Sequence, residues 1–374
     1  MDAAARVLTV NPGSSSLKLA LLDAGGTVLH TLDAPAGDGD READRLAGAI
    51  AGWPRPGAVG LRFVHGGADL VHPVVVDEAV ARRLQDLADL APLHQPQSLY
   101  ALAEIRRALP GVPVVACFDT AFHAGLPPAA STYAIPAEWR ERFGLRRYGF
   151  HGLSHAHASR RGAELLGLDP GTARLVVCHL GSGSSLAAVE GGRSVDTTMG
   201  FTPLDGLVMA TRPGALDPGV PLWLVRHGVP AAEVEDALAH RSGLRGLAGT
   251  GDLREVRERA EEGDAAALAA LDVFHHRLRG CAAAMAASLG GPDALVFTGG
   301  IGEHDPATRR RLAADLAHLG VALDEDANAA ARGDADVGAP GARVRAAVVT
   351  AREDLEIAAG TRAALATGRP DAPP

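Results

Sequence analysis

The sequence carries one short plan twice, and the second copy lies about halfway along the chain. Residues 6–19, RVLTVNPGSSSLKL, read as an apolar strand, a glycine-serine turn and a second strand, and residues 174–188, RLVVCHLGSGSSLAA, repeat this order. Each second strand then runs into a glycine pair, Gly25–Gly26 or Gly191–Gly192. Strand patterns joined by tight turns predict a β-hairpin at each place. Two such hairpins in 374 residues predict two related domains.

The two glycine-serine turns also suggest a chemical role. A tight turn presents backbone N–H groups and hydroxyls in a concavity of the kind that holds phosphate oxygens. Turns of this composition are also ordinary hairpin links, so one alone would indicate little. Lys18 follows the first turn and is the only lysine among 36 basic residues. A compact ammonium suits phosphate in ways that a planar guanidinium does not copy, although an isolated surface lysine would fit the same position.

The rest of the chain alternates helical and strand patterns. Apolar residues near helical spacing predict helices, and short β-rich runs between them predict strands. This alternation favours an α/β fold. The predicted helices include Glu78–Leu90, Ser98–Leu109 and Asp354–Thr367, and the predicted strands include Val112–Cys117, Ala294–Thr298 and Val344–Thr350.

Composition excludes several classes of protein. With 47% hydrophobic and 22% charged residues the chain is typical of a globular protein. No apolar stretch approaches the roughly 18 residues that span a bilayer, and no signal-peptide pattern opens the sequence, so we expect a cytoplasmic protein. A net charge of −9 argues against nucleic-acid binding. Cys117, Cys178 and Cys281 lie far apart, which predicts reduced core residues and neither a disulfide framework nor a zinc site.

Ten motifs occur along the chain in an order that resembles one known family. They are NPGSSSLK (11–18), RFVHGG (62–67), APLHQP (91–96), FDTAFH (118–123), RRYGFHGLSH (146–155), HLGSGSS (179–185), DTTMGFTPLDGLVMATRPGALDPG (196–219), GDLR (251–254), FTGGIGEH (297–304) and REDLEIA (352–358). Together they resemble the acetate kinase family, of the acetate and propionate kinase group, nearly from end to end.

The resemblance implies a fold and a domain organisation. The family has two duplicated actin-like, sugar-kinase-like ATPase domains, which are ribonuclease H-like α/β domains with an interdomain cleft. Domain I is expected at 1–120 with a returning C-terminal helix at 354–374. Domain II is expected at 121–353, where the nucleotide binds and where a homodimer would form.

The resemblance also implies an activity. The expected reaction is the reversible transfer of the γ-phosphoryl group of ATP to acetate, with propionate as the second acceptor. The expected metal is Mg²⁺, for which Mn²⁺ would be a substitute. Ser182 and His304 stand where the family usually has asparagine, which leaves the phosphoryl donor open between ATP and pyrophosphate.

Phosphoryl transfer asks a protein for positioning and for positive charge around the equatorial oxygens. By resemblance Arg62 holds the substrate carboxylate, and His151 and Arg212 stabilise the transferring group. A carboxylic acid with a pKa near ~4 is ionised at neutral pH and needs no general base. Asp119, the third expected catalytic residue, is therefore predicted to place Mg²⁺ and orient the reactants, with Asn11 and Glu353 as the other metal-site residues.

The resemblance assigns two further groups of residues. The acceptor pocket should be small and apolar, and one methylene is worth only about 1–3 kcal/mol of discrimination. Its lining beside Arg62 is expected from Val64, Leu93, Phe150 and Pro203. The nucleotide is expected at Lys18, His179, Leu180, Gly181, Ser182, Gly183, Asp252, Leu253, Arg254, Gly300, Ile301, Gly302, Glu303 and His304.

Other functions remain compatible with the sequence. A hydrolase on the same fold, acting on acyl phosphate or polyphosphate, would release phosphate without an acceptor. A nucleotide-binding regulator would bind ATP without turnover. A pyrophosphate-dependent acetate kinase would differ only in its donor.

Overall fold

The computed structural model describes residues 6–13, 16–35, 48–91 and 94–367. They fold into two compact units that each combine segments distant in the sequence. Unit 1 comprises Met1–Ala124, Phe150–Leu153 and Arg352–Pro374, and unit 2 comprises Gly125–Gly149 and Ser154–Ala351. Leu93 lies outside the described residues.

Unit 1 contains a mixed six-stranded sheet with the strand order β3-β2-β1-β4-β6-β5. The first three strands form an antiparallel meander, β4 and β6 continue it in parallel with β1, and β5 closes the edge antiparallel to β6. The predicted first hairpin is confirmed. The strands are β1 (Val7–Pro12), β2 (Ser16–Leu22), β3 (Val28–Pro35), β4 (Ala58–Phe63), β5 (Val74–Val75) and β6 (Val114–Phe118).

Unit 2 contains a second sheet built on the same plan. Read from β9, its order is β9-β8-β7-β10-β12-β11, with an antiparallel meander, two parallel strands and an antiparallel edge strand. Each strand has its counterpart in unit 1, which confirms the predicted duplication and the α/β class. The strands are β7 (Arg174–Leu180), β8 (Ser184–Glu190), β9 (Arg193–Thr197), β10 (Ala294–Thr298), β11 (Ala335–Asp336) and β12 (Arg345–Val348).

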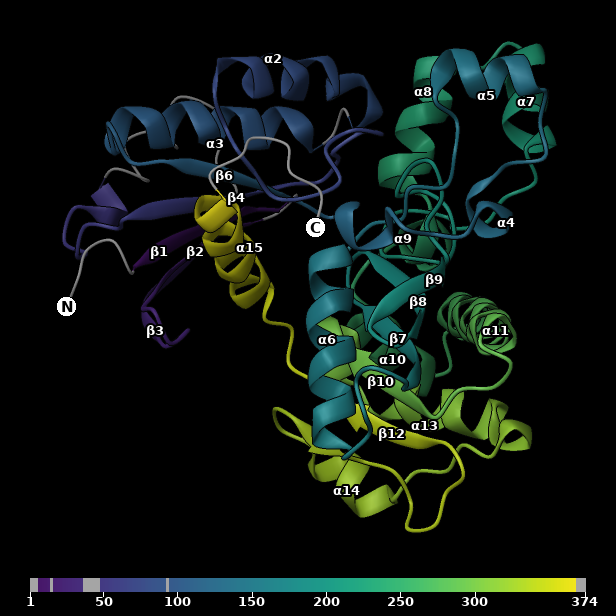
Figure 1. The fold of residues 1–374 in the computed structure, drawn as a ribbon. Helices are drawn as coiled ribbons and strands as arrows, with labels where there is room; N and C mark the ends of the chain where they lie inside the picture. The colour runs from purple at the N-terminus through teal and green to yellow at the C-terminus, as the bar shows by residue number, and fades with distance from the viewer. Residues whose placement is uncertain (1–5, 14–15, 36–47, 92–93, 368–374) are drawn as a thin grey trace. The chain divides into compact units, whose positions relative to one another are not determined.

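Helices cover both faces of the sheet in unit 1. Alternate strand residues such as Leu8, Leu61 and Phe118 face one way and form a core with α2 (Glu78–Asp86) and α3 (Gln95–Ala108). The opposite face packs against α15 (Glu353–Thr367), as Figure 1 shows. At Gly60 a Cβ atom would lie 2.3 Å from Thr361 Oγ1, so only glycine lets α15 approach this closely.

In unit 2 the helix α11 (Ala265–Ser288) supplies Phe274, Leu278 and Ala282 to a core shared with β7, β8, β10 and β12. The helix α6 (Gly152–Leu165) packs on β10, where a Cβ atom at Gly162 would lie 2.7 Å from a methyl group of Val296. Helix α6, which follows β6 after a 3₁₀ turn and two short helices, therefore packs on the second sheet, and α15, which follows β12, packs on the first.

The remaining helices belong to the segments that connect these elements. The α-helices are α4 (Pro128–Ser131), α5 (Ala137–Phe143), α7 (Gly219–Arg226), α8 (Ala231–Asp236), α9 (Gly243–Ala248), α10 (Leu253–Glu261), α12 (Gly299–His304), α13 (Pro306–Asp315) and α14 (Glu325–Ala330). The 3₁₀ turns are η2 (Ala88–Leu90), η3 (Ala121–His123) and η5 (Ala317–Leu319), and η4 (Ala237–Arg241) is a π-helix.

Several local predictions differ from the structure. The helix predicted at Ser98–Leu109 is α3, Gln95–Ala108, and the strand predicted at Val112–Cys117 is β6, Val114–Phe118. The helix predicted at Glu78–Leu90 ends at Asp86, because the backbone at Leu87 leaves the helical region, and a 3₁₀ turn follows. The strand predicted at Val344–Thr350 is shorter, Arg345–Val348. Cys281 is only partly buried, whereas the other two cysteines are buried; all three are free thiols. Among the described residues no helix is long and apolar enough to cross a membrane.

Candidate active site

Four residues predicted to act on the substrate or metal meet at one edge of the sheet in unit 1. Arg62 lies on β4, Asn11 lies at the end of β1, and Asp119 directly follows β6. These are the carboxyl ends of the three parallel strands, where α/β sheets bind ligands. Arg62 alternates with Gly60 and so shares the sheet face that α15 covers. Glu353, the first residue of α15, completes the group.

Hydrogen bonds connect these four side chains. Arg62 Nε and Nη2 donate to the two carboxylate oxygens of Asp119 at 2.8 and 2.5 Å, which is the bidentate geometry of a strong ion pair. Arg62 Nη1 donates to Asn11 Oδ1 at 3.0 Å and to the Pro12 carbonyl at 3.4 Å. Asn11 Nδ2 donates to Glu353 Oε2 at 2.5 Å. Arg62 therefore uses most of its five N–H donors within the protein, and a substrate carboxylate would have to share them.

Burial and charge oppose each other in this network. Burial alone lowers the pKa of Arg62, but the neighbouring Asp119 and Glu353 carboxylates reverse the effect and raise it. Burial raises the pKa of Asp119, whose side chain is 1% exposed, while Arg62 and a hydrogen bond from the His151 backbone oppose the rise. The Glu353 charge adds to the rise at Asp119, so the two carboxylates repel each other. A cation near both would relieve that repulsion.

His151 has an unusual backbone. Its φ of 56° makes it the one non-glycine residue with positive φ among the described residues. The next residue, Gly152, donates its N–H to the Asp119 carbonyl at 2.9 Å, and a Cβ atom at Gly152 would lie 2.2 Å from that oxygen. The segment is thus held against the end of β6. Backbone strain of this kind is common at functional sites, where the surrounding structure maintains it.

The residues predicted to line the acceptor pocket do not all belong to one unit. Val64 and Phe150, which belong to unit 1, are 4% and 1% exposed. The Phe150 ring lies edge-on to the His65 ring at 5.6 Å between centroids. Pro203 belongs to unit 2, and its carbonyl accepts a hydrogen bond from Arg212.

Lys18 also belongs to unit 1. It lies on β2 directly opposite Asn11 of β1 and Asp33 of β3, and its side chain is exposed. Directly opposed residues of antiparallel strands point to the same face of a sheet. The only lysine of the chain is therefore a neighbour of Asn11 on the sheet face that carries Arg62.

In unit 2 the predicted nucleotide segments His179–Gly183 and Gly300–His304 lie next to each other. The first is the end of β7 and its turn into β8, and the second forms most of α12, which directly follows β10. Gly299 has a φ of 78°, and a Cβ atom there would lie 2.7 Å from the Leu180 carbonyl oxygen, so glycine allows the close approach. Glu303 Oε1 accepts from the N–H groups of Gly299 and Ala351 at 3.1 and 3.0 Å.

Two serines that the sequence prediction did not assign support the β7–β8 turn. Ser154 Oγ lies 2.8 Å from His179 Nδ1 and fixes the orientation of that ring. Ser184 Oγ accepts from the Gly181 N–H at 3.2 Å and donates to the Gly181 carbonyl at 3.1 Å. Both serines lie within quoted motifs, but the sequence does not show which hydroxyl meets which partner.

The third predicted nucleotide segment, Asp252–Arg254, begins α10. Asp252 Oδ1 caps the helix by accepting from the Arg254 N–H at 2.9 Å, and Oδ2 accepts from Arg254 Nη2 at 2.7 Å. These contacts lower the pKa of Asp252, and the largest cause is the hydrogen bond from the Arg254 side chain. Leu253 is buried in the core, and Leu180 is buried in the same core. Because their side chains lie in the core, these two leucines can contact a ligand through their backbone groups.

Arg212 lies in unit 2 on the connection between β9 and α7. Its Nη1 donates to the Pro203 carbonyl at 2.9 Å, and among the described residues no carboxylate pairs with it. Burial lowers its pKa to about 10, so the guanidinium remains charged at neutral pH. A partly buried cation without a carboxylate partner is suited to an incoming anion.

The donor set expected for a metal consists of one amide and two carboxylates. Asn11, Asp119 and Glu353 offer oxygen atoms, the ligands that Mg²⁺ prefers, and Mg²⁺ usually keeps several waters. Within the described part of the chain no three His, Cys, Asp or Glu residues form a group that would hold a metal alone. The residues present therefore fit a cation that is also held by water or by substrate phosphates.

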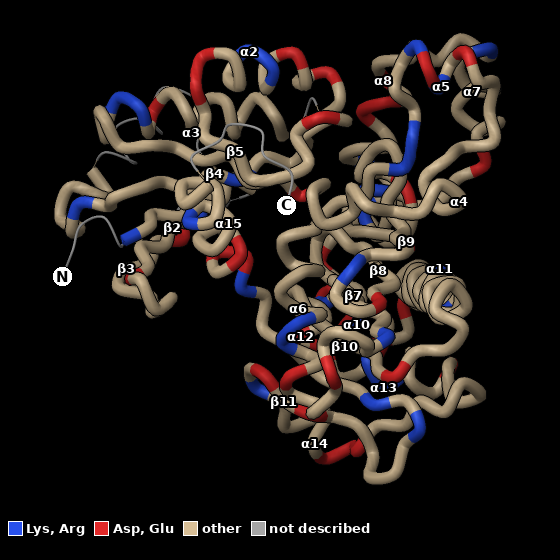
Figure 2. The backbone as a smooth tube through the Cα atoms, viewed as in Figure 1, with Lys and Arg blue, Asp and Glu red and all other residues tan. Residues whose placement is uncertain are grey.

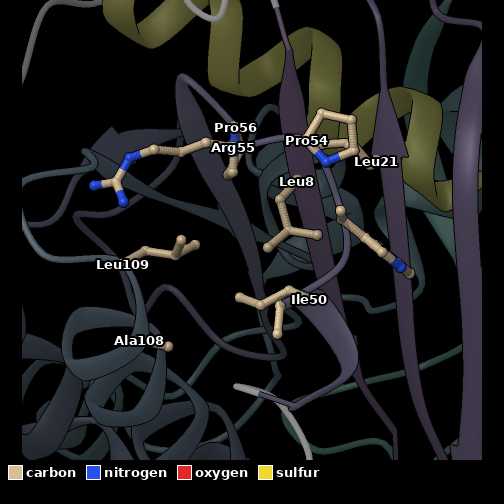
Figure 3. A pocket seen from close by; sticks show the side chains of 10 residues that line it. Leu8, Leu21, Ile50, Pro54, Arg55, Pro56, Ala108 and Leu109 are labelled. Carbon is tan, nitrogen blue, oxygen red and sulfur yellow. The ribbon is translucent and has the colours of Figure 1, made fainter.

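A separate pocket of about 300 Å³ lies elsewhere in unit 1. Figure 3 shows its lining, which includes Leu8, Leu21, Ile50 and Leu109. Leu8 belongs to the opposite sheet face from Asn11, so this pocket is separate from the polar network. Arg55 is its one charged lining residue, and it donates to the Pro110 carbonyl at 2.9 Å. The apolar lining offers nothing for phosphoryl transfer.

Comparison with known proteins gives a consistent result. The model of the Acetokinase family matches residues 56–359. An acetate kinase from Leifsonia xyli subsp. xyli is 45% identical over 97% of this chain and 99% of its own length. The crystal structure of an acetate kinase from Porphyromonas gingivalis is 33% identical, with a TM-score of 0.87 over 96% of this chain and 100% of that chain. A propionate kinase structure from Francisella tularensis is also 33% identical, with a TM-score of 0.89 over 96% of this chain and 99% of that one.

Proposed function

The chain belongs to the acetokinase family, and from this premise we propose that it is an acetate kinase, which transfers the γ-phosphoryl group of ATP reversibly to acetate. A sequence identity of 45% to an acetate kinase over 97% of this chain supports this activity, and so does the similarity of the fold to a solved acetate kinase structure. The single observation in the site that carries it is Arg212, a partly buried guanidinium without a carboxylate partner among the described residues. Such a group suits a transferring phosphoryl group.

In the proposed reaction an oxygen of acetate attacks the γ-phosphorus while the bond to the β-phosphate oxygen breaks. The products are acetyl phosphate and ADP. Acetate is ionised at neutral pH, so no proton has to be removed from it. Arg62 would hold the carboxylate, and Arg212 and His151 would stabilise the charge on the equatorial oxygens.

Asp119 acts in this proposal through position and charge. Its two carboxylate oxygens accept from Arg62, and its backbone carbonyl accepts from the N–H of Gly152, the residue after His151. Asp119 therefore orients both the Arg62 guanidinium and the His151 segment. When bound, Mg²⁺ or its substitute Mn²⁺ would neutralise the β- and γ-phosphate charges. Asn11, Asp119 and Glu353 are the residues that would hold it, directly or through water.

The nucleotide is proposed to bind to Lys18 of unit 1 and to the three segments of unit 2, His179–Gly183, Asp252–Arg254 and Gly300–His304. The glycines of these segments permit close backbone approach to phosphate. The acceptor is proposed to be acetate first and propionate second, since the buried side chains of Val64 and Phe150 leave little space for a longer chain.

A homodimer is the proposed assembly, and a cytoplasmic location goes with the family. An apolar surface in unit 2 supports the dimer. Helix α7 has no buried residue, and its Leu222 and Trp223 are 62% and 53% exposed. Contiguous apolar side chains on a water-facing helix are typical of an interface.

The test of the activity is acyl phosphate formation trapped with hydroxylamine. ATP and pyrophosphate would each be supplied with Mg²⁺ and with acetate, propionate, butyrate or no acceptor. We expect product from ATP with acetate most of all, and loss of product in Arg62→Ala. Phosphate release without an acceptor would identify a hydrolase. Acyl phosphate formed from pyrophosphate and not from ATP would identify pyrophosphate as the phosphoryl donor. Nucleotide binding without either product would contradict the proposed kinase activity.

A further inference from the structure

Helix α12 (Gly299–His304) carries most of one proposed nucleotide segment and has only six residues. A helix of this length is not stable through its own hydrogen bonds, because nucleation is costly and few bonds follow it. Three of its first four residues, Gly299, Gly300 and Gly302, are glycines, which lower helix propensity further. The position of α12 must therefore come from its neighbours.

One neighbour is Arg309 of α13, the largest fully buried side chain among the described residues, at 1% exposure. Its Nη1 donates to the carbonyl oxygens of Gly302 and Glu303, each at 2.9 Å. Its Nε donates to Asn328 Oδ1 and its Nη2 to the Asn328 carbonyl, each at 2.7 Å. The guanidinium thus joins the C-terminal end of α12 to α14, which contains Asn328.

The charge of Arg309 is buried without a hydrogen-bonded carboxylate in the described part of the chain. Burial is the main cause that lowers its pKa. Its hydrogen-bond acceptors are neutral carbonyl and amide oxygens, two of them at the end of a helix, where the helix dipole favours a cation. A buried charge is tolerated only where its donors are satisfied, so α12 and α14 are held at the distances that the planar guanidinium sets.

The opposite end of α12 is held by a charge of opposite sign. Glu303 Oε1 accepts from the Gly299 N–H and from the Ala351 N–H. A carboxylate at the first N–H groups and a guanidinium at the last carbonyls both favour the helix dipole. Both ends of this short helix are therefore fixed by charged side chains.

The N-cap residue of the same helix, Asp305, also contacts α10, the helix that begins within the Asp252–Arg254 segment. Arg257, on the first turn and a half of α10, donates to Asp305 Oδ2 at 2.6 Å. Asp305 Oδ1 in turn caps α13 by accepting from the Ala307 N–H at 3.1 Å. Figure 2 shows α10, α12 and α13 in unit 2 with the charged residues along them. Two proposed nucleotide segments are thus connected to the start of α13, at its N-cap Asp305 and at Arg309, which are four positions apart in the sequence.

We propose that Arg309 is a positioning residue for the nucleotide: it fixes α12 so that Gly300–His304 present their backbone to the nucleotide. This inference rests on the proposed function for the identity of the ligand, an adenine nucleotide. Arg309 itself is buried and does not contact the ligand. Its loss therefore weakens nucleotide affinity, while the affinity for acetate, which depends on Arg62 of unit 1, is maintained.

The experiment compares four variants with the wild type. Arg309→Met removes the charge and the donors at similar volume, and Arg309→Lys restores the charge with fewer donors. Asn328→Ala removes one arm of the network and serves if Arg309→Met fails to fold. The matched control is Arg310→Met, because Arg310 lies on the same helix, is exposed and pairs with Glu325 at the surface.

Two measurements are made on each variant: calorimetric binding of MgADP, and steady-state KM values for ATP and acetate. We expect Arg309→Met to weaken MgADP binding by about 10-fold or more and to raise the KM for ATP equally, with the KM for acetate within about twofold at saturating ATP. Arg309→Lys and Asn328→Ala should lie between Arg309→Met and the wild type, and Arg310→Met should match the wild type.

Other results would overturn the inference. If Arg309→Met lowered the melting temperature but left MgADP affinity unchanged, Arg309 would be structural only. If the KM values for ATP and acetate rose together, the effect would not be specific to the nucleotide. A wild type that binds MgADP but makes no acetyl phosphate would contradict the proposed function, and the binding series would still decide the role of Arg309.

Discussion

Arg62 is the residue on which both proposed substrate binding and the polar network of unit 1 depend. Its guanidinium donates to Asp119, Asn11 and the Pro12 carbonyl. A substrate carboxylate has to compete with these acceptors, so a change at Arg62 alters the free site as well as the complex. This coupling distinguishes Arg62 from an arginine that waits unpaired for its ligand.

Arg62→Lys should therefore lose acetate binding although the charge remains. An ammonium cannot make the bidentate fork, and Asp119 would retain one strong hydrogen bond in place of two. We expect kcat/KM for acetate to fall by about 10- to 100-fold, with the KM for ATP changed much less. Steady-state kinetics with each substrate varied would test this, and an unchanged KM for acetate would remove Arg62 from the acceptor site.

Asp119→Asn tests the metal and orientation role of Asp119. An amide preserves the shape but not the charge, so Mg²⁺ should bind more weakly and the Mg²⁺ concentration for half-maximal rate should rise. Because acetate needs no general base, the pH–rate profile should keep its shape. A normal Mg²⁺ dependence together with a lost basic limb of that profile would instead favour a base role.

Gly152→Ala should displace His151. The new Cβ atom would lie 2.2 Å from the Asp119 carbonyl oxygen, so the strained segment at the end of β6 would have to move. We expect kcat to fall by about 100-fold or more, because small misplacements of a positioned group are costly. Gly280→Ala is the matched control, since Gly280 lies within α11 with open space around it and should gain about 0.4–1 kcal/mol of stability. Normal kcat in Gly152→Ala would show that the His151 segment tolerates movement.

At the scale of elements, the end of β4 makes folding sensitive to acid. His65 lies two residues after that strand and is fully buried. Its Nδ1 accepts the Gly67 N–H at 2.8 Å, which requires that nitrogen to be unprotonated. Burial lowers the pKa of His65 to about 4. The unfolded chain binds the proton near pH 6.5, so stability is complete above that pH and is lost as the pH falls from 6.5 towards 4.

His65→Asn should reduce this loss, because the Asn oxygen can replace Nδ1 as acceptor without titrating. We expect the wild type to lose up to about 1.4 kcal/mol per pH unit more than the variant between pH 6.5 and 4. Urea unfolding of both proteins at pH 7, 6 and 5 provides the comparison. Equal slopes would mean that His65 is not neutral in the folded state.

The elements that the sequence predicted well are those with local signals. Both hairpins were predicted from glycine-serine and glycine-glycine turns, and β10 was predicted at its observed limits, Ala294–Thr298. The end of α2 was missed, because Leu87 leaves the helix without a glycine or proline to mark the place. Helix ends without such residues depend on the packing around them, which a sequence does not display.

At the scale of the whole molecule, the proposed homodimer predicts that two chains pair through the exposed apolar side chains of α7 in unit 2. Trp223→Glu on α7 should therefore give a monomer, since a buried charge would replace a large apolar contact. Light scattering after gel filtration should show twice the chain mass of 38.3 kDa for the wild type and the single mass for the variant. Leu365→Glu, an exposed leucine of α15 in unit 1, is the control. A wild-type monomer, or a dimer that survives Trp223→Glu, would contradict this surface.

The structure brings together only some of the residues that were predicted to form the site. The structure brings Asn11, Arg62, Asp119 and Glu353 together in unit 1 and places two nucleotide segments side by side in unit 2. The roles of these residues stay predictions, and so do the domain limits of 1–120 with 354–374 and 121–353. Leu93 lies outside the described residues, so its place in the acceptor pocket also stays a prediction.

The sequence alone determined the duplicated α/β plan, the tight turns and the residues that carry charge, because turn chemistry and strand alternation are local properties of a chain. Only the tertiary structure decided which charges meet. Asn11 and Glu353 are 342 positions apart, and Arg62 and Asp119 are 57 apart. Arg309 carried no signal at all, since its function follows from burial between two helices. Such contacts arise from packing, which joins distant segments through a geometry that no short stretch of sequence contains.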